Sequence, residues 1–137
     1  MPLPEPLTAL LSPDAYAHPA ADIRLIETHI SWVILAGEFA YKLRRPVNLG
    51  FLDFSDPERR HQDCRDEVRL NRRGCTTLYL GVVPITRAAG RVVCDGRGEV
   101  LDWAVRMRRL PQERMLASLL ETGAVTFDML GRLLSLA

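Results

Sequence analysis

The sequence lacks an excess of charge of either sign, because 18 lysines and arginines nearly balance 17 aspartates and glutamates and leave a formal net charge of +1. This balance argues against a surface built throughout for nucleic acid or acidic lipid, although a local basic patch is compatible with it. No apolar run reaches the ~20 residues that span a bilayer, and the first residues have no basic segment followed by an apolar one. We therefore expect a cytoplasmic protein without a membrane span.

Cysteine is also scarce. Cys64, Cys75 and Cys94 are odd in number and form no CxxC pair, which argues against a disulfide framework and against a zinc knuckle. We expect reduced thiols. Hydrophobic residues make up 47% of the 137 positions, so the chain is predicted to fold as one ordinary domain with a core.

The first 22 residues differ in composition from the rest of the chain. Five prolines lie within the first 19 positions and leave room for one or two helical turns. We therefore predict a helical or irregular extension at residues 1–22.

From Ile23 onward apolar and polar residues alternate, which is the two-residue period of a β-strand. The run is rich in β-branched and aromatic residues and is long enough to contain a bend or turn. One side is predicted to carry Ile26, Thr28, Ile30, Trp32 and Ile34. A tight turn at residues 36–38 and a second strand at residues 39–44 follow, with Phe39, Tyr41 and Leu43 on one face and Ala40, Lys42 and Arg44 on the other.

A helix is predicted at residues 56–73. Ser55 and Glu58 have the spacing of a capping box, with a proline in the first turn, and Gly74 is placed to end the helix. Its only substantial apolar side chains are those of Cys64, Val68 and Leu70, so the helix can bury only a narrow stripe.

Three further strands are expected at residues 78–85, 91–94 and 100–107, followed by helices at 112–120 and 126–136. Strands, one helix, strands and then helices predict an α+β fold with a mainly antiparallel sheet. The final residues form an apolar stripe, so we expect the chain to stop within a larger fold.

Two residues are candidates for chemistry. Lys42 lies in the middle of a strand, where the plain alternative is an edge-strand lysine that discourages pairing between sheets. Glu67 lies on the flank of the helical stripe. It either pairs with surface arginines such as Arg59 or Arg60, or reaches inward to a cation on the sheet.

The segment Phe39-Ala40-Tyr41-Lys42 has the arrangement of the Val-Ala-Ile-Lys element of protein kinases, and a helix with a glutamate follows it. Segments 27–33, 39–47, 50–55, 67–73, 78–85 and 104–111 carry a wider likeness. As a set they resemble the N-terminal lobe of bacterial aminoglycoside phosphotransferase-like proteins, a branch of the kinase-like superfamily. In that branch this domain is often fused to a P-loop ATPase-type kinase domain.

The resemblance implies that residues 23–110 are the small, nucleotide-binding lobe and that residues 111–137 begin an incomplete large lobe. It implies an ATP site in which Lys42 holds the α and β phosphates, Ala40 leaves room for the nucleotide ring and Glu67 pairs with the lysine. Residues 106–110, including Arg106, Met107 and Arg108, would form the hinge whose backbone faces the adenine. The family function is ATP-dependent phosphoryl transfer to a small hydroxylated molecule.

The sequence departs from the kinase pattern at several points. No glycine-rich loop precedes Lys42, and no His-Gly-Asp or Asp-Phe-Gly motif supplies a base aspartate and Mg²⁺ ligands. Asp53-Phe54-Ser55 looks like the latter, but it precedes the helix that carries Glu67. We therefore expect weak ATP binding at most, no catalysis by this chain alone, and Mg²⁺ only if a large lobe is supplied. A separate large lobe or a P-loop kinase domain is a possible partner.

Two other functions stay open. The chain is alternatively a non-catalytic interaction module, or a homo-oligomer, that docks through its exposed final helix. A third hypothesis is nucleic-acid binding by the arginine-rich helix, but acidic residues interleave with the arginines and favour a solvated, salt-bridged face. His61 and Cys64 lie three residues apart, and we expect ordinary packing of them rather than a metal site.

Overall fold

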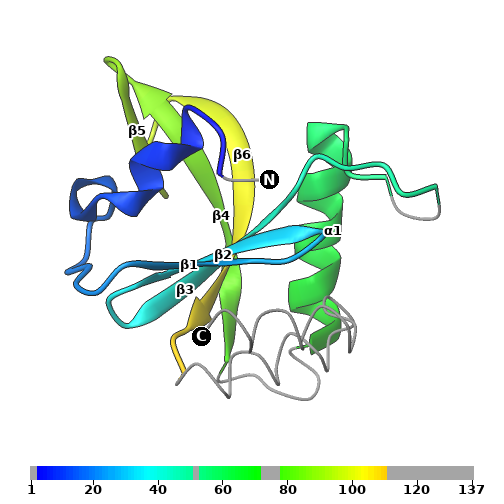
Figure 1. Ribbon diagram of the computed structural model, residues 1–137, viewed down its shortest axis with the longest axis horizontal. Helices are drawn as coiled ribbons and strands as arrows, with labels where there is room; N and C mark the ends of the chain where they lie inside the picture. Colours follow the sequence, from blue (N-terminus) through cyan, green and yellow to red (C-terminus); the bar gives the residue numbers. More distant parts are fainter. Residues whose placement is uncertain (1–2, 51–52, 72–77, 111–137) are drawn as a thin grey trace.

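The computed structural model describes residues 3–50, 53–71 and 78–110, and shows an α+β fold with a six-stranded antiparallel sheet and one α-helix. The predicted fold class is confirmed at this level. The strands are β1 (Arg24–Glu27), β2 (Ser31–Ala36), β3 (Phe39–Arg44), β4 (Tyr79–Ala88), β5 (Arg91–Cys94) and β6 (Glu99–Arg108), and the helix is α1 (Pro57–Asn71). Their order across the sheet is β1-β2-β3-β6-β4-β5. Figure 1 shows the long strands β4 and β6 curling away from the hairpins formed by β1, β2 and β3.

The first predicted strand contains a tight turn, as its length allowed, and forms the two strands β1 and β2. Thr28 Oγ1 accepts hydrogen bonds from the backbone N–H groups of Ile30 at 3.3 Å and Ser31 at 2.9 Å, and these reverse the chain. Ile26 therefore lies opposite Val33 in the neighbouring strand. The prediction that Ile26 and Trp32 share a side was wrong, because the turn changes which residues face each side.

The turn between β2 and β3 needs a glycine. Gly37 has a φ of +64°, and a Cβ at this position would lie 2.2 Å from the carbonyl oxygen of Pro19. The close approach brings the N-terminal extension against the sheet, where residues Leu7–Leu11 and Pro13–Ala15 form short 3₁₀-helices. The predicted limit of one or two helical turns in this extension is confirmed.

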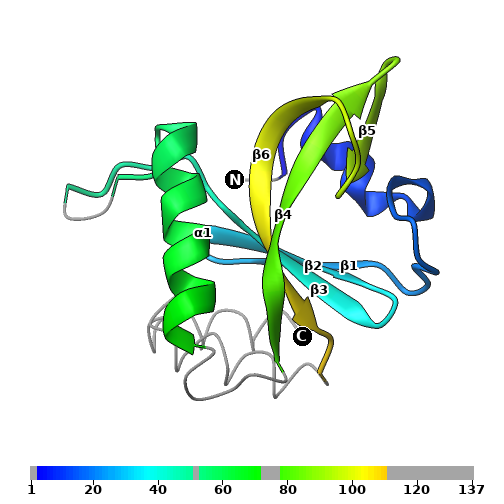
Figure 2. The same ribbon diagram turned by 180° about the vertical axis from the view of Figure 1, so that it is seen from behind.

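The sheet buries its two faces against different elements. Figures 1 and 2 place α1 on one side and the N-terminal extension on the other. The cluster on the α1 face contains Ile26, Val33, Leu35, Ala40, Cys64, Val68, Leu78, Tyr79, Val105 and Met107. The cluster on the extension face contains Leu3, Leu7, Leu10, Ala15, Tyr16, Ala20, Trp32, Ile34, Ala36, Tyr41, Leu43, Val83, Ile85, Cys94 and Ala104.

The helix begins one residue later than a Ser55 cap would place it. Asp56 Oδ1 accepts a hydrogen bond from the backbone N–H of Glu58 at 3.0 Å, whereas the N–H and hydroxyl of Ser55 both donate to Asp53. Asp56 is therefore the N-cap, and the predicted capping box with Ser55 was wrong. The last described residue of the helix is Asn71, so the predicted end near residues 73 and 74 lies outside the described residues.

The stripe that α1 buries is more polar than expected. Its buried residues are Arg60, Cys64, Glu67 and Val68. Leu70 is 54% exposed, so its predicted place in the stripe was wrong. A helix with this buried set requires charged partners on the sheet.

Several expectations concern other parts of the chain. The thiols of Cys64 and Cys94 are free and buried, whereas Cys75 and the predicted helices at 112–120 and 126–136 lie outside the described residues. In the part of the chain that the structure describes, no helix combines the length and the apolar character needed to cross a membrane.

Candidate functional site

The structure brings Lys42 and Glu67 together. Lys42 Nζ lies 3.1 Å from Glu67 Oε2, and both side chains are buried, with 2% and 7% of their surface exposed. The edge-strand explanation of Lys42 was wrong, because β3 lies between β2 and β6. Glu67 reaches inward rather than to a surface arginine, and the contact predicted between the two residues is confirmed.

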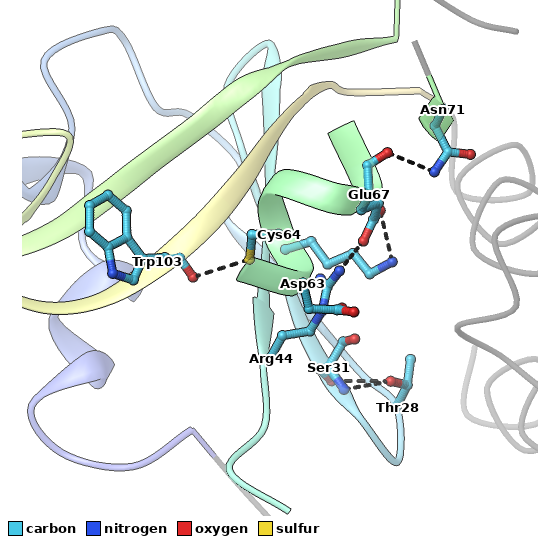
Figure 3. A network of polar contacts seen from close by, with 9 residues as sticks. Thr28, Ser31, Arg44, Asp63, Cys64, Glu67, Asn71 and Trp103 are labelled. Atoms are coloured by element: carbon cyan, nitrogen blue, oxygen red, sulfur yellow. Dashed lines mark hydrogen bonds and ion pairs between the residues drawn. The ribbon is translucent and has the colours of Figure 1, made fainter. Parts of the chain in front are cut away.

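Two further charged residues join this ion pair. Arg44 Nη2 donates to Glu67 Oε1, and Arg44 Nε donates to Asp63 Oδ2 at 2.6 Å. Each oxygen of the Glu67 carboxylate therefore accepts from a different cation. We call Lys42, Arg44, Asp63 and Glu67 the charge cluster (Figure 3).

The charges in this cluster are balanced but not equivalent. Burial raises the pKa of Glu67, but Lys42 and Arg44 outweigh it and hold that pKa below the ordinary 4.5. Burial lowers the pKa of Lys42, Glu67 raises it and Arg44 lowers it further, leaving it below the ordinary 10.5. Burial lowers the pKa of Arg44, but Glu67, Cys64 and Asp63 raise it by more, so the guanidinium stays charged. The pKa of Lys42 is thus lowered mainly by its burial, whereas the pKa of Arg44 is raised.

Lys42 is also the only lysine of the chain, since the other 17 basic residues are arginines. An ammonium is a compact charge with three donors, whereas a guanidinium is a planar fork, so the two are not interchangeable at a packed site. In an arginine-rich sequence this single lysine is a signal that sequence reasoning missed.

The site is packed against apolar neighbours. Ala40 is fully buried beside it on β3 and lies opposite Met107 of β6. Cys64 of α1 is fully buried in the same apolar cluster as Ala40, and its Sγ donates to the backbone oxygen of Trp103 at 4.0 Å. Burial raises the pKa of Cys64 to about 12, so this thiol is not a nucleophile at neutral pH.

The β1–β2 turn borders the charge cluster, as Figure 3 shows for Thr28 and Ser31 beside Arg44. Ser31 is fully buried and lies directly opposite Arg44 in the strand pairing. Within the described ranges, Ser31 Oγ and Arg44 Nη1 are buried atoms with no hydrogen-bond partner. Hydrogen bonds to the Thr28 side chain hold this turn.

The predicted hinge residues lie inside a paired strand. Arg106 is paired with Tyr41 and Gly81, and Met107 with Ala40 and Tyr79. The Arg108 N–H donates to the Leu78 carbonyl at 3.0 Å. With strands on both sides, Arg106, Met107 and Arg108 have their backbone turned to β3 and β4 rather than to an open edge.

Arg106 faces away from the charge cluster. Its guanidinium lies over the rings of Phe39 and Tyr41 and pairs with Asp95 at 3.1 Å. This places Arg106 on the extension face. A pocket of about 390 Å³ lies on the same side, lined mainly by the extension and the β4–β5 hairpin, and contains none of the predicted site residues.

A second buried ion pair fixes the start of α1. Arg60 Nε lies 3.2 Å from Asp102 Oδ1 of β6, and Arg60 Nη1 donates to the Phe54 carbonyl at 2.8 Å. The Asp53 carboxylate, by contrast, binds Ser55 and the exposed Arg59. Although Asp53-Phe54-Ser55 resembles a metal-binding motif, its residues make contacts at the beginning of helix α1.

The remaining arginines and histidine of α1 have local partners. Arg69 pairs with Asp66 at 3.2 Å and Arg65 donates to Gln62, as the salt-bridged interpretation of this helix predicts. The His61 ring stacks on Trp103, with centroids 3.6 Å apart and 2° between the planes. Among the described residues, no group of three His, Cys, Asp or Glu side chains is arranged to hold a metal.

The sequence contained a partial signal for the two residues that prediction missed. Arg44 shares the strand face of Lys42, and Asp63 precedes Glu67 by one helical turn. Alternation and helical periodicity thus identify the faces, but the pairing depends on how α1 sits on the sheet.

Comparison with known proteins gives relatives without a stated activity. Uncharacterized proteins of Mycobacterium bovis and Mycobacterium tuberculosis are 36% identical over 110 residues, which is 78% of this chain and 20% of theirs. The chain thus spans about a fifth of the length of these relatives. No protein-family model matches the chain, and no solved structure matches it significantly.

Proposed function

We propose that the chain is the nucleotide-binding lobe of an aminoglycoside phosphotransferase-like kinase. The observation that carries this proposal is the buried ion pair between Lys42 of β3 and Glu67 of α1. A lysine fixed by a helix glutamate is the arrangement with which protein kinases hold the phosphates of ATP. In this proposal Lys42 holds the α and β phosphates and Glu67 orients it.

The chemistry of the site supports a phosphate ligand in particular. Lys42 uses one of its three N–H donors on Glu67, and the buried neighbours Ser31 and Arg44 each retain a donor. These donors suit the oxygens of an anion. In this proposal Ala40 supplies the small side chain that leaves room for the nucleotide ring. The adenine contact falls to residues 109–110, the part of the predicted 106–110 hinge that follows the end of β6.

The reaction of the complete protein is phosphoryl transfer from ATP to a small hydroxylated molecule in the cytoplasm. This chain alone has no His-Gly-Asp or Asp-Phe-Gly motif, so in this proposal a large lobe supplies the base and the Mg²⁺ ligands. The free thiols of Cys64 and Cys94 support the reducing compartment.

The test is ATP binding by the 137-residue chain, measured by isothermal titration calorimetry. Lys42→Met should weaken binding by about 10-fold or more, the worth of one charge-assisted hydrogen bond to phosphate. Arg87→Met is the matched control, because Arg87 is an exposed cation paired with Glu99 at 2.6 Å. We expect no ATP hydrolysis in any sample.

Equal ATP affinity in the unmodified chain and the Lys42→Met variant would contradict the phosphate role of Lys42. ATP hydrolysis by the unmodified chain, if Lys42→Met abolishes it, would contradict the proposal that the catalytic base and the Mg²⁺ ligands lie outside this chain. A circular dichroism spectrum of each variant establishes that the sheet is intact.

A further inference from the structure

We propose that Arg44 is a positioning residue that holds helix α1 where Glu67 meets Lys42, and that it does so without nucleotide. The effect of Arg44 on ATP affinity rests on the proposed function. Its effect on the helix and on Lys42 does not.

The geometry is that of a clamp on two successive turns of the helix. Asp63 and Glu67 are four residues apart and therefore lie on one face of α1. Arg44 reaches both, through Nε to Asp63 Oδ2 at 2.6 Å and through Nη2 to Glu67 Oε1. A guanidinium has donors on different edges of one plane and can bridge two carboxylates, which a single ammonium does less well.

Arg44 connects the helix to the sheet through ion pairs that do not depend on Lys42. Since each oxygen of Glu67 has its own cation, loss of the Lys42 contact would still leave Glu67 bound to Arg44. The Arg44 side chain is 4% exposed, so moving α1 away would leave a buried guanidinium without its carboxylates. The arrangement thus opposes displacement of the helix even when the phosphate site is empty.

The clamp acts on the second half of α1. The first half is attached separately, through Arg60 to Asp102 of β6 and to the Phe54 carbonyl. Arg44 also lies on β3 two residues from Lys42, so the same strand carries the clamp and the lysine. Removing Arg44 should therefore loosen residues 63–71 more than residues 57–62.

Arg44 also shifts the pKa of Lys42, which burial lowers most. The Arg44 guanidinium repels the Lys42 ammonium and binds one of the two oxygens of the Glu67 carboxylate. Without Arg44 that repulsion disappears and the Glu67 carboxylate interacts with Lys42 alone. The pKa of Lys42 should therefore rise. A residue that only filled space would not change this titration.

The first test compares Arg44→Met and Arg44→Lys with Arg69→Met in the nucleotide-free 137-residue chain. Arg69 is the matched control, because it pairs with a carboxylate of the same helix from an exposed position. Amide hydrogen exchange should accelerate about 10-fold or more across residues 63–71 in Arg44→Met, and less in Arg44→Lys, because local opening exposes the amides. The rate in Arg69→Met should stay unchanged.

The second measurement follows the Lys42 ammonium by NMR with lysine labelled at Nζ. The signal is unambiguous because the chain has one lysine. Its titration midpoint should move to higher pH in Arg44→Met and stay in place in Arg69→Met. Unchanged exchange in residues 63–71 together with an unchanged midpoint would overturn the proposal.

The third measurement is ATP affinity, which should fall several-fold in Arg44→Met and stay unchanged in Arg69→Met. If the unmodified chain binds no ATP, the proposed function fails, while exchange and titration still decide the clamp. If ATP binds equally well to Arg44→Met while exchange accelerates, the role of Arg44 in ATP affinity is overturned and its role in holding the helix is confirmed. Should Arg44→Met fail to fold, Asp63→Asn releases one arm of the clamp and should accelerate exchange several-fold, and an unchanged rate would count against the proposal.

Discussion

The two faces of the sheet are buried by different chemistry. The extension face is closed by apolar and aromatic side chains, among which Trp32 is fully buried and Leu10 is 1% exposed. The α1 face includes Lys42, Arg44 and Glu67, all at most 8% exposed. Many apolar side chains of similar volume can pack against an apolar face. Buried charges, by contrast, are stable only when opposite charges or hydrogen-bond partners lie at particular positions. The α1 face is therefore the more specific of the two, and it is the face on which we propose that a nucleotide binds.

The largest effect on stability is expected when the carboxylate that Lys42 and Arg44 share is removed. Glu67→Ala should cost about 3–5 kcal/mol in the free energy of unfolding, because it leaves Lys42 and Arg44 buried without it. Urea denaturation followed by circular dichroism measures this cost. The double variant Lys42→Met with Glu67→Leu should recover part of it, because position 42 is no longer charged while Arg44 keeps Asp63 but not Glu67 as a partner. A double variant no more stable than Glu67→Ala would refute the assignment of the cost to unpaired charge.

A smaller loss is expected on the extension face. Leu10→Ala should reduce the free energy of unfolding by about 3 kcal/mol, which is typical of a buried leucine that leaves a cavity. Because no charge is uncovered, the loss should be the same at pH 5 and pH 8 in urea denaturation. A loss that varies with pH would show that the extension also supports the ionised residues of the opposite face.

The smallest effect concerns the pH dependence of stability. The pKa of Glu67 is lowered in the folded protein, so its ionisation stabilises the fold above the ordinary value of 4.5. That stabilisation should be lost as the pH falls through the lowered pKa.

The Asp102 carboxyl should behave in the opposite way. Burial raises its pKa above the ordinary 3.8 by more than Arg60 lowers it, so rising pH through that window works against folding. The unfolding temperature should be measured between pH 3 and pH 7. Compared with the unmodified chain, it should rise less steeply with pH in Glu67→Gln and more steeply in Asp102→Asn. Identical profiles for both variants and the unmodified chain would contradict these assignments.

Much of the local structure was determined by the sequence alone. Alternation at residues 39–44 predicted β3 with its faces correctly assigned, and turn residues predicted the strands that became β4, β5 and β6. The likeness of residues 39–42 to a kinase element, followed by a helix with Glu67, predicted the contact with Lys42. These features depend on local periodicity, which is present in the order of the residues.

Other features were decided only by the tertiary structure. The turn at Thr28 depends on side-chain hydrogen bonds, and it changed which residues share a face with Trp32. The partners of Arg44 and Arg60 depend on how α1 is placed against the sheet, since many arginines in this sequence have an acidic residue nearby. Periodicity gives the face on which a charge lies, but the choice of partner depends on distances between segments remote in the chain. Packing sets those distances, because a buried charge is stable only where an opposite charge lies within reach.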